Sequence, residues 1–474
     1  EVITRGGFLA KGIHDPITKE IPYSGISAAL SDILKQLLSR PDFIEHKKAI
    51  RENLAGLEDP LSTIAPDVAH FIDHIPNATM LAATDAKPRL LSGIIALINT
   101  ICGGKTPLVI SLDNLQWIDS ASIDLFDDLF TRNQLPFVML LGAYRFPALE
   151  TKEQIRTQIQ KLRERSPSLE LLQVENLSIG CVNRLISESL FRAEEETIEF
   201  AKLVLEKTRG NPLSVKEFLN RTFDKGFLRF DRTHREWVWD ISQITSEPPS
   251  ENVSLPLIHQ LQSLDSTTIK LLKMAACIGI EFDLELLQRV SGLSHTETSN
   301  QLYLAVQQGY LLQTPNLQLQ DKRAIFRFAH ERIQQAAYEL IDQKERRQTH
   351  AEIGQTILEG IQGDSYESIF DIVNQLNNSF EVPDNIQGDR LKLAELNVAA
   401  GYKAKSAAAF QQAFKYFRTA IAMLGQDAWV QHDRCLEMHL EAASTAYLCG
   451  DERQLDGLTS TILEHARSPL DIAR

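Results

Sequence analysis

An apolar run that ends in a carboxylate is the first candidate for chemistry in this sequence. Residues 108–113 read LVISLD, which places Asp113 at the carboxyl end of a buried strand. Ligands of open α/β sheets bind in the crevice outside these strand ends. A single carboxylate there can hold Mg²⁺ while the metal also binds nucleotide phosphates, so Asp113 is the candidate metal ligand and catalytic residue.

The glycines just before this strand do not form a phosphate-binding loop. GGKT at 103–106 matches the end of the G-x-x-x-x-G-K-[ST] pattern, whose backbone N–H groups wrap phosphates. The first glycine of that pattern would have to be residue 99, which is Asn99, and the pattern occurs nowhere else in the chain. In addition, a helical pattern precedes GGKT and a strand follows it, whereas the phosphate-binding loop follows a strand and precedes a helix. We therefore interpret GGKT as a helix-ending turn.

Alternating helical and apolar patterns around Asp113 predict an α/β fold over residues 1–150. RGGFLAKG is strand-like, helical patterns follow at 24–40 and 88–101, and SASIDLFDDLFTRN precedes a second apolar run, PFVMLLGAYR. Short, nearly continuous apolar strands between helices are typical of a parallel sheet buried on both faces.

The rest of the chain reads as three further segments. Residues 151–250 are expected to be helical up to residue 222, with a hairpin in GFLRFDRTHREWVWD. Residues 251–345 follow a winged-helix order, in which three helices (the second around FDLELLQRVSG) precede the strands GYLLQTP and AIFRFAH and a last helix. Residues 346–474 are helical and Ala-rich. Gly401, Ala413, Phe417 and Ala420 have the spacing of a tetratricopeptide helix pair, although plain helical hairpins fit equally well.

Bulk composition excludes several classes of function. The net charge of −14 argues against nucleic acid or an anionic membrane as the main partner. The segment at 294–309, the candidate DNA-reading helix, contains no Lys or Arg. Five scattered cysteines without a CxxC pair indicate neither a disulfide framework nor a zinc site, and no apolar run reaches the ~18 residues of a membrane span. A cytoplasmic protein is expected.

The segment around Asp113 resembles a known family. LVISLDNLQWIDSASIDLF is similar to the "LDDLQWAD-S-SLDLL" segment of STAND-type, AAA-like ATPases (signal transduction ATPases with numerous domains), and most of all to the ATPase modules of bacterial hybrid proteins. Those proteins carry a serine/threonine kinase domain in front and sensor histidine kinase domains behind. Six other segments resemble the family in the same order: IPYSGISAALSDILKQLL, LLGAYR, KTRGNPLSVKEFL, GFLRFDRTHREWVWD, FRFAHERIQQAAYELI and LAELNVAAGYKAKSAAAFQQAFKYF.

The resemblance implies a fold and a division into domains. A P-loop NTPase-type α/β core at 1–150 would be followed by a helical lid with a hairpin at 151–250. A winged helix at 251–345 and TPR-like helical repeats at 346–474 would complete the chain. In the family a P-loop lies just before the strand that resembles RGGFLAKG. The chain is therefore expected to lack that segment and to bind ATP, ADP and Mg²⁺ poorly by itself.

Three further motifs carry over from the family. Arg145 occupies the place of the sensor 1 arginine, which can contact the γ-phosphate, although a surface ion pair is the alternative. Gly210, Asn211 and Pro212 resemble the lid motif near the adenine, or else form a turn that begins a helix. His330 resembles the winged-helix histidine that reaches the β-phosphate of ADP, and the alternative is a structural histidine.

Two departures from the family concern hydrolysis and the winged helix. Asn114 stands where family members usually carry a second acid, plausibly the base that activates water, and an amide cannot accept that proton. We expect slow or absent hydrolysis, with Asp119 as a candidate substitute base. Glu331 in place of Asp is a milder departure.

The resemblance implies a nucleotide-dependent regulatory switch in signal transduction. ADP would hold the core, lid and winged helix closed, and exchange for ATP would release them to control attached kinase domains. The helical repeats would bind protein partners, and a nucleotide-dependent oligomer is possible. The alternative is a degenerate, non-hydrolysing protein-interaction scaffold.

Overall fold

The computed structural model divides the chain into two compact units. Unit 1 comprises Glu1–Leu169, Leu271–Phe328 and Ile341–Arg474, and unit 2 comprises Glu170–Lys270 and Ala329–Leu340. The structure describes residues 2–72, 83–103, 105–131, 135–145, 169–247, 254–314, 324–360, 368–380, 387–425 and 428–473, with the isolated positions 157, 160, 161, 163 and 164. Each unit is described by itself below.

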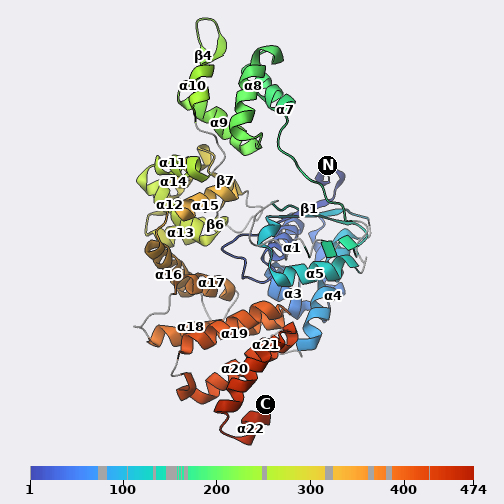
Figure 1. The fold of residues 1–474 in the computed structure, drawn as a ribbon. Helices are drawn as coiled ribbons and strands as arrows, with labels where there is room; N and C mark the ends of the chain where they lie inside the picture. The colour runs from blue at the N-terminus through green and yellow to red at the C-terminus, as the bar shows by residue number, and fades with distance from the viewer. Residues whose placement is uncertain are drawn as a thin grey trace. The chain divides into compact units, whose positions relative to one another are not determined.

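A parallel three-stranded sheet in the order β1-β2-β3 lies at the centre of the N-terminal part of unit 1 (Figure 1). The strands are β1 (Phe8–Ile13), β2 (Leu108–Asp113) and β3 (Val138–Gly142). They coincide with the strand-like segment RGGFLAKG and the two apolar runs of the sequence, so the predicted parallel sheet is confirmed. In the register of the sheet, Ile13 lies opposite Asp113.

Helices cover one face of this sheet. Phe8, Ala10, Leu108 and Leu112 are buried in a core shared with the helices that follow β1 and β2. On the opposite face Met139 of β3 is 59% exposed and Leu141 is 52% exposed, so the expectation of a sheet buried on both faces is wrong for β3. The helices are α1 (Ser24–Leu38), α2 (Phe43–Asn53), α3 (Glu58–Ile64), α4 (Ala83–Cys102) and α5 (Ser120–Thr131).

The turn before β2 bears out the interpretation of GGKT. Helix α4 ends at Cys102, and Gly103 has a φ of +51°, the left-handed conformation common after a helix. The backbone N–H groups of Lys105 and Thr106 then donate to the carbonyl of Cys102, and β2 begins at Leu108.

Residues 266–328 combine helices with a small antiparallel sheet of order β6-β8-β7. The expected strands at the end are present, but the helix expected around FDLELLQRVSG begins later. Asp283 caps it by accepting from Glu285 N and Leu286 N, and residues 281–283 pair with β8 instead. The elements are α12 (Ser266–Ile278), β6 (Glu281–Asp283), α13 (Leu284–Ser291), α14 (His295–Gln307), β7 (Leu311–Thr314) and β8 (Ile325–Phe328).

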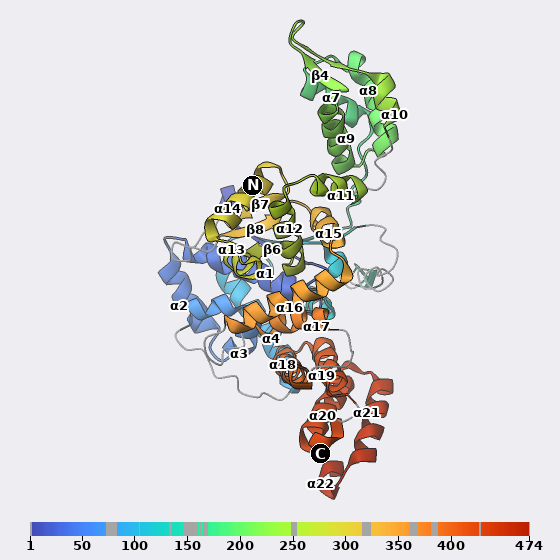
Figure 2. The ribbon, with the colours of Figure 1, turned by 90° about the vertical axis from the view of Figure 1, so that its left-hand side faces the viewer.

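The C-terminal part of unit 1 is helical, as predicted, and successive helices pack on one another (Figure 2). Gly401 of α18 faces the ring of Phe417 in α19, which is the small/large pairing read from the spacing. The helices are α16 (Gln343–Glu359), α17 (Ile369–Ser379), α18 (Gln387–Ser406), α19 (Phe410–Leu424), α20 (His432–Cys449), α21 (Glu452–His465) and α22 (Pro469–Ala473).

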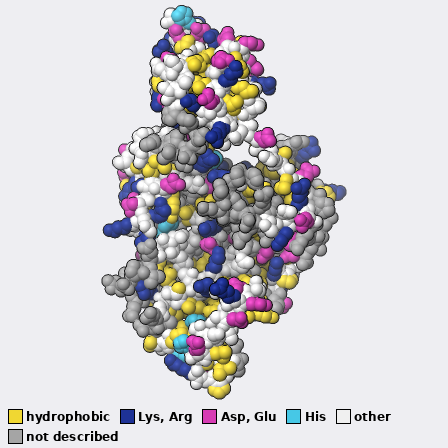
Figure 3. Space-filling view, viewed as in Figure 1, with side chains coloured by type: hydrophobic (Ala, Val, Ile, Leu, Met, Phe, Trp, Pro, Cys, Tyr) yellow, Lys and Arg dark blue, Asp and Glu magenta, His cyan; other side chains and the backbone are white. Residues whose placement is uncertain are grey.

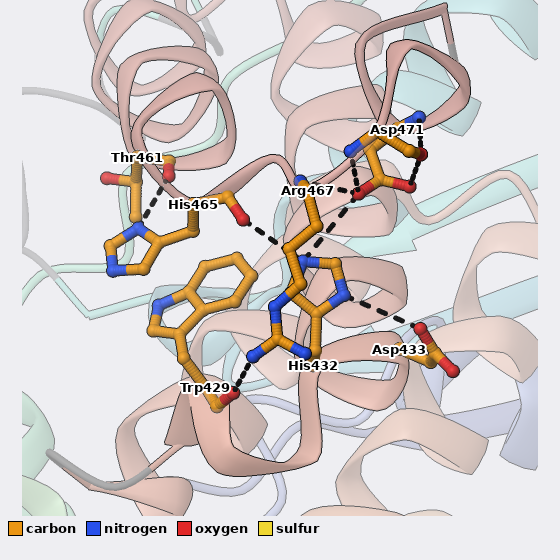
Figure 4. A network of polar contacts seen from close by, with 8 residues as sticks. Trp429, His432, Asp433, Thr461, His465, Arg467 and Asp471 are labelled. Carbon is orange, nitrogen blue, oxygen red and sulfur yellow. Dashed lines mark hydrogen bonds and ion pairs between the residues drawn. The ribbon is translucent and has the colours of Figure 1, made fainter.

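An aromatic and polar cluster closes the α20–α21 pair (Figure 4). The Trp429 ring stacks on that of His465, with ring centroids 4.2 Å apart and an interplanar angle of 6°. His432 Nε2 lies 3.0 Å from the His465 carbonyl oxygen, and the Arg467 guanidinium donates to the Trp429 carbonyl. These contacts fix the end of α21 against the start of α20.

Unit 2 contains a helical group and the predicted hairpin. The hairpin strands are β4 (Leu228–Asp231) and β5 (Glu236–Trp239), which pair antiparallel. Residues 169–178 are irregular, which corrects the all-helical expectation for 151–222, and there Leu177 N donates to Gly210 O (2.8 Å). The helices are α7 (Ile179–Leu190), α8 (Glu194–Thr208), α9 (Pro212–Asp224), α10 (Ile241–Ser246), α11 (Ser254–Gln262) and α15 (Glu331–Glu339).

Lys and Arg side chains are interspersed with Asp and Glu on the face drawn in Figure 3. Among the helices that the structure describes, none is long and apolar enough to cross a membrane.

Candidate functional site

The Asp113 carboxylate lies exposed at the carboxyl end of β2. Its Oδ1 accepts a hydrogen bond from Asn114 N (2.8 Å). The other oxygen has no hydrogen-bond partner among the described residues. Because it faces solvent at the strand end, this oxygen is free to bind a cation.

A chain of amide contacts crosses the ends of all three strands. Asn114 Nδ2 donates to the carbonyl of His14, which follows β1 (3.3 Å). Gln116 Nε2 donates to Asn114 Oδ1 (3.4 Å), and Gln116 Oε1 accepts from the backbone N–H of Arg145, which follows β3 (3.3 Å). The chain links the carboxyl ends of β1, β2 and β3, so Asp113, Asn114 and Arg145 lie at one edge of the sheet.

The backbone explains why an amide or acid stands at position 114. Asn114 has φ 56° and ψ 42°, in the left-handed region where Asn and Asp are several-fold enriched. An acid at this position would therefore keep the same backbone. Asn114 instead uses both ends of its amide in the chain of contacts.

Asp119, the candidate substitute base, is buried at the start of α5. Its carboxylate accepts from the backbone N–H of Ser122 (3.0 Å) and from Ser122 Oγ (2.5 Å), which caps the start of α5. The backbone of Tyr23 also donates to it, and burial raises the pKa of this carboxyl. These hydrogen bonds give Asp119 a structural role, and its role as a substitute base stays a prediction.

Sequence reasoning missed His14 and Gln116. The His14 side chain is fully buried, and neither ring nitrogen has a hydrogen-bond partner among the described residues. Burial lowers the pKa of His14 to about 4, so the ring is neutral at pH 7. The sequence could have indicated Gln116 through its place in the LDNLQW motif, close to Asp113 and Asn114. Nothing in the sequence marks His14.

In unit 2, each residue of Gly210-Asn211-Pro212 has a local structural reason. Gly210 has a φ of +74°, and a Cβ there would come within 2.3 Å of the Leu177 carbonyl oxygen. Asn211 caps α9 by accepting from Ser214 N (3.1 Å), and Pro212 occupies the first helical position. The turn that begins a helix is therefore present.

His330 caps a helix as well. Its Nδ1 accepts from Arg332 N (3.1 Å) at the start of α15, and the side chain is exposed. Glu331 is buried and accepts from Gln335 Nε2 (2.6 Å). The cap accounts for Nδ1 of the ring, so a structural role for His330 is present, and a contact with nucleotide stays a prediction.

Glu217 is a perturbed acid that sequence reasoning did not single out. It lies in α9, after the lid motif, and burial raises its pKa to about 7. The positive charges of Arg332, Arg221 and Lys216 oppose this rise. Arg332 follows His330, so Glu217 links the two candidate motifs of unit 2 electrostatically.

The described residues include no group of three or more His, Cys, Asp or Glu side chains that could hold a metal ion. A single carboxylate such as Asp113 suits Mg²⁺, which keeps several waters and takes its other oxygen ligands from phosphates.

The N-terminal part of the chain is similar to a known domain. Residues 1–141 match the family described as AAA ATPase domain. The match includes β1, β2 and Asp113, and ends within β3.

Two curated proteins are similar over much of the chain. Hybrid signal transduction histidine kinase G of Dictyostelium discoideum is 28% identical over an alignment of 377 positions, which covers 65% of this chain and 11% of that protein. Peroxide stress-activated histidine kinase mak3 of Schizosaccharomyces pombe is 18% identical over 86% of this chain and 19% of its own length. The chain therefore spans about a tenth to a fifth of these relatives.

One solved structure, a STAND protein with a tetratricopeptide repeat sensor from Pyrococcus horikoshii, aligns with this chain. The alignment covers 98% of this chain and 63% of the Pyrococcus horikoshii chain. The sequence identity is 11% and the TM-score 0.43, a value that establishes no shared fold. The candidate site thus lies in a segment similar to an AAA ATPase domain, within a chain similar to part of two histidine kinases.

Proposed function

We propose that the chain is a nucleotide-dependent switch of a signalling protein. The observation that carries the proposal is the exposed Asp113 carboxylate, with one unpartnered oxygen, at the end of a buried parallel strand. The similarity of residues 1–141 to an AAA ATPase domain supports it. Nucleotide and Mg²⁺ are the ligands of this site.

Each candidate residue has a role in the proposed switch. Asp113 holds Mg²⁺, and Arg145 contacts the γ-phosphate of ATP. Gly210, Asn211 and Pro212 lie against the adenine, and His330 reaches the β-phosphate of ADP. When bound, the nucleotide supplies negative phosphate charge, which Mg²⁺ and the Arg145 guanidinium would balance. ADP favours a closed state and ATP an open one.

No G-x-x-x-x-G-K-[ST] pattern occurs in these 474 residues, so the proposed switch needs a phosphate-wrapping loop from elsewhere in the protein. The exposed apolar side chains of β3, Met139 and Leu141, support a place for it. Parallel sheets are normally covered on both faces. A strand, loop and helix alongside β3 would cover these side chains and bring the loop to the strand ends near Asp113.

Hydrolysis is slow in this proposal. The Asn114 amide is held by His14 O and Gln116 Nε2 and cannot accept a proton. Asn114→Asp keeps the backbone and restores an acid, so it should speed turnover in a protein that binds ATP. An unchanged rate would contradict the role of this position.

The remaining parts transmit the state of the switch. In the proposal, residues 1–150, 151–250, 251–345 and 346–474 are the nucleotide core, lid, winged helix and helical repeats. The repeats bind protein partners, and the switch controls histidine and serine/threonine kinase domains of a longer cytoplasmic protein. Nucleotide-dependent oligomers are one way to do so.

The test is calorimetric titration of the full-length natural protein with Mg–ATP and Mg–ADP. Binding is expected, Asp113→Asn should weaken it, and the exposed control Asp224→Asn should not. His330→Ala should weaken ADP more than ATP, and equal losses would contradict the closed-state role. If the full-length protein binds no nucleotide, the switch is wrong and a protein-interaction scaffold remains.

A further inference from the structure

The loop between β1 and α1 (residues 14–23) is bonded directly to the candidate site. His14 N donates to the carbonyl of Asp113 (3.1 Å), and the carbonyl of His14 accepts from Asn114 Nδ2 (3.3 Å). The position of residue 14 is therefore fixed to the two residues that define the site. A movement of either end of this contact displaces the other.

The same loop is held by α17 and by the turn between α18 and α19. Asn374 Nδ2 of α17 donates to the carbonyl of Ile17 (2.6 Å). The hydroxyl of Tyr23 donates to the carbonyl of Ala407, in the turn that joins α18 to α19 (2.9 Å). Tyr23 and Ala407 are 2% and 1% exposed, so water cannot replace this bond if it is lost.

Helix α19 adds two contacts to the middle of the loop. The ammonium of Lys415 pairs with the Glu20 carboxylate (2.6 Å), at an exposed position. The hydroxyl of Tyr416 lies 3.4 Å from the carbonyl oxygen of Glu20 and donates to it. The loop thus contacts α17, the α18–α19 turn and α19 within ten residues.

Asp15 connects the loop to the small antiparallel sheet. This buried carboxylate accepts from the backbone N–H of Ile17 (2.7 Å) and from that of Ile280, which precedes β6. Gly279, next to Ile280, has a φ of +155°. All of these residues belong to unit 1.

We infer that residues 14–23 are the coupling segment through which the C-terminal helices and the site at Asp113 act on each other. The inference rests on the proposed function. Buried polar contacts are costly to leave unpaired, so the loop cannot follow a change at Asp113 and Asn114 without moving its partners on α17 and α18–α19. Coupling of this kind is reciprocal: nucleotide alters the helices, and loosening the helices alters nucleotide affinity.

The test is hydrogen–deuterium exchange of the full-length natural protein with and without Mg–ADP. Tyr23→Phe removes one hydroxyl from the loop. The matched control is Tyr402→Phe, which also removes one hydroxyl. That hydroxyl donates to the Glu437 carboxylate and not to the loop at 14–23. Lys415→Met is a second variant at an exposed position, which is not expected to impair folding.

In the parent, Mg–ADP should change exchange in residues 14–23 and 404–416. Tyr23→Phe should at least halve the change at 404–416 and shift the ADP dissociation constant at least threefold. Lys415→Met should act in the same direction by a smaller factor, and Tyr402→Phe should match the parent.

The outcomes separate the two proposals. If ADP binds but leaves exchange at 404–416 unchanged, or if Tyr23→Phe and Lys415→Met both match Tyr402→Phe, the coupling inference is wrong. If the parent binds no ADP, the proposed function is wrong, and the inference falls with it.

Discussion

The pairing of α18 with α19 leaves no room for a side chain at Gly401. A Cβ built there would come within 2.7 Å of Phe417 Cε1, 2.8 Å of Cζ and 2.9 Å of Cδ1. Real Cβ atoms do not approach other atoms this closely, so Gly401→Ala must displace the ring. Phe417 is fully buried, and interiors are packed too densely for a free shift.

The expected loss follows from two opposing effects. Overpacking of a buried site costs about 1–3 kcal/mol, whereas Ala is favoured over Gly in a helix by about 1 kcal/mol. Gly401→Ala should therefore lower the free energy of unfolding by up to about 2 kcal/mol. Gly457 in α21 is exposed, with nothing within 4 Å of its Cβ position. Gly457→Ala keeps only the helix preference and should stabilise by up to about 1 kcal/mol.

Urea unfolding of the two variants and the parent measures this difference, with hydrogen exchange of α18 and α19 as the local readout. Phe417→Leu should relieve part of the strain, so the double variant with Gly401→Ala should be less destabilised than the two single losses added together. If Gly401→Ala and Gly457→Ala shift the midpoint equally and in the same direction, the close packing of α18 on α19 is wrong.

Two further predictions concern titratable groups. The pKa of His14 is about 4 in the folded protein, compared with an ordinary value of 6.5. Between pH 7 and pH 4 the free energy of unfolding of the unsubstituted protein should therefore fall by about 3 kcal/mol relative to that of His14→Leu. If urea titrations give the two proteins the same dependence of stability on pH, the ring is not buried in its neutral form. Burial raises the pKa of Glu217 from 4.5 to about 7, so stability decreases as pH rises through that window. Glu217→Gln should stabilise unit 2 at pH 8 but not at pH 4, as followed by tryptophan fluorescence, and an equal effect at both values would refute the shift.

Local patterns were sufficient for most of the fold. The two apolar runs became β2 and β3 of the parallel sheet, as their apolar character predicted, but the second face of β3 is exposed, so burial on both faces was not predicted correctly. The spacing of Gly401 and Phe417 likewise predicted a contact that the structure contains. The missed strand β6 shows the limit, because residues 281–283 are extended through their pairing with β8, more than forty residues later.

The candidate site was predictable only where its residues follow one another in the sequence. Asp113 and Asn114 end a strand, and that ending is visible in the pattern. The contacts of Gln116 with Asn114 and Arg145 depend on how β2 and β3 are aligned. His14 is exceptional for a different reason: a histidine after a strand is ordinarily exposed, and its complete burial arises from the helix α1 that packs over it.

The loop at 14–23 also depends on residues that are far away in the sequence. HDPITKEIPY reads as a polar connector with two prolines, and such segments are usually variable surface turns. Here its polar groups bond residues 357 to 384 positions away, such as Asn374 and Ala407. A loop fixed by partners so distant in sequence is ordered only when those partners are in place. Its conformation therefore reports the state of the C-terminal helices, and its first residue delivers that state to Asp113.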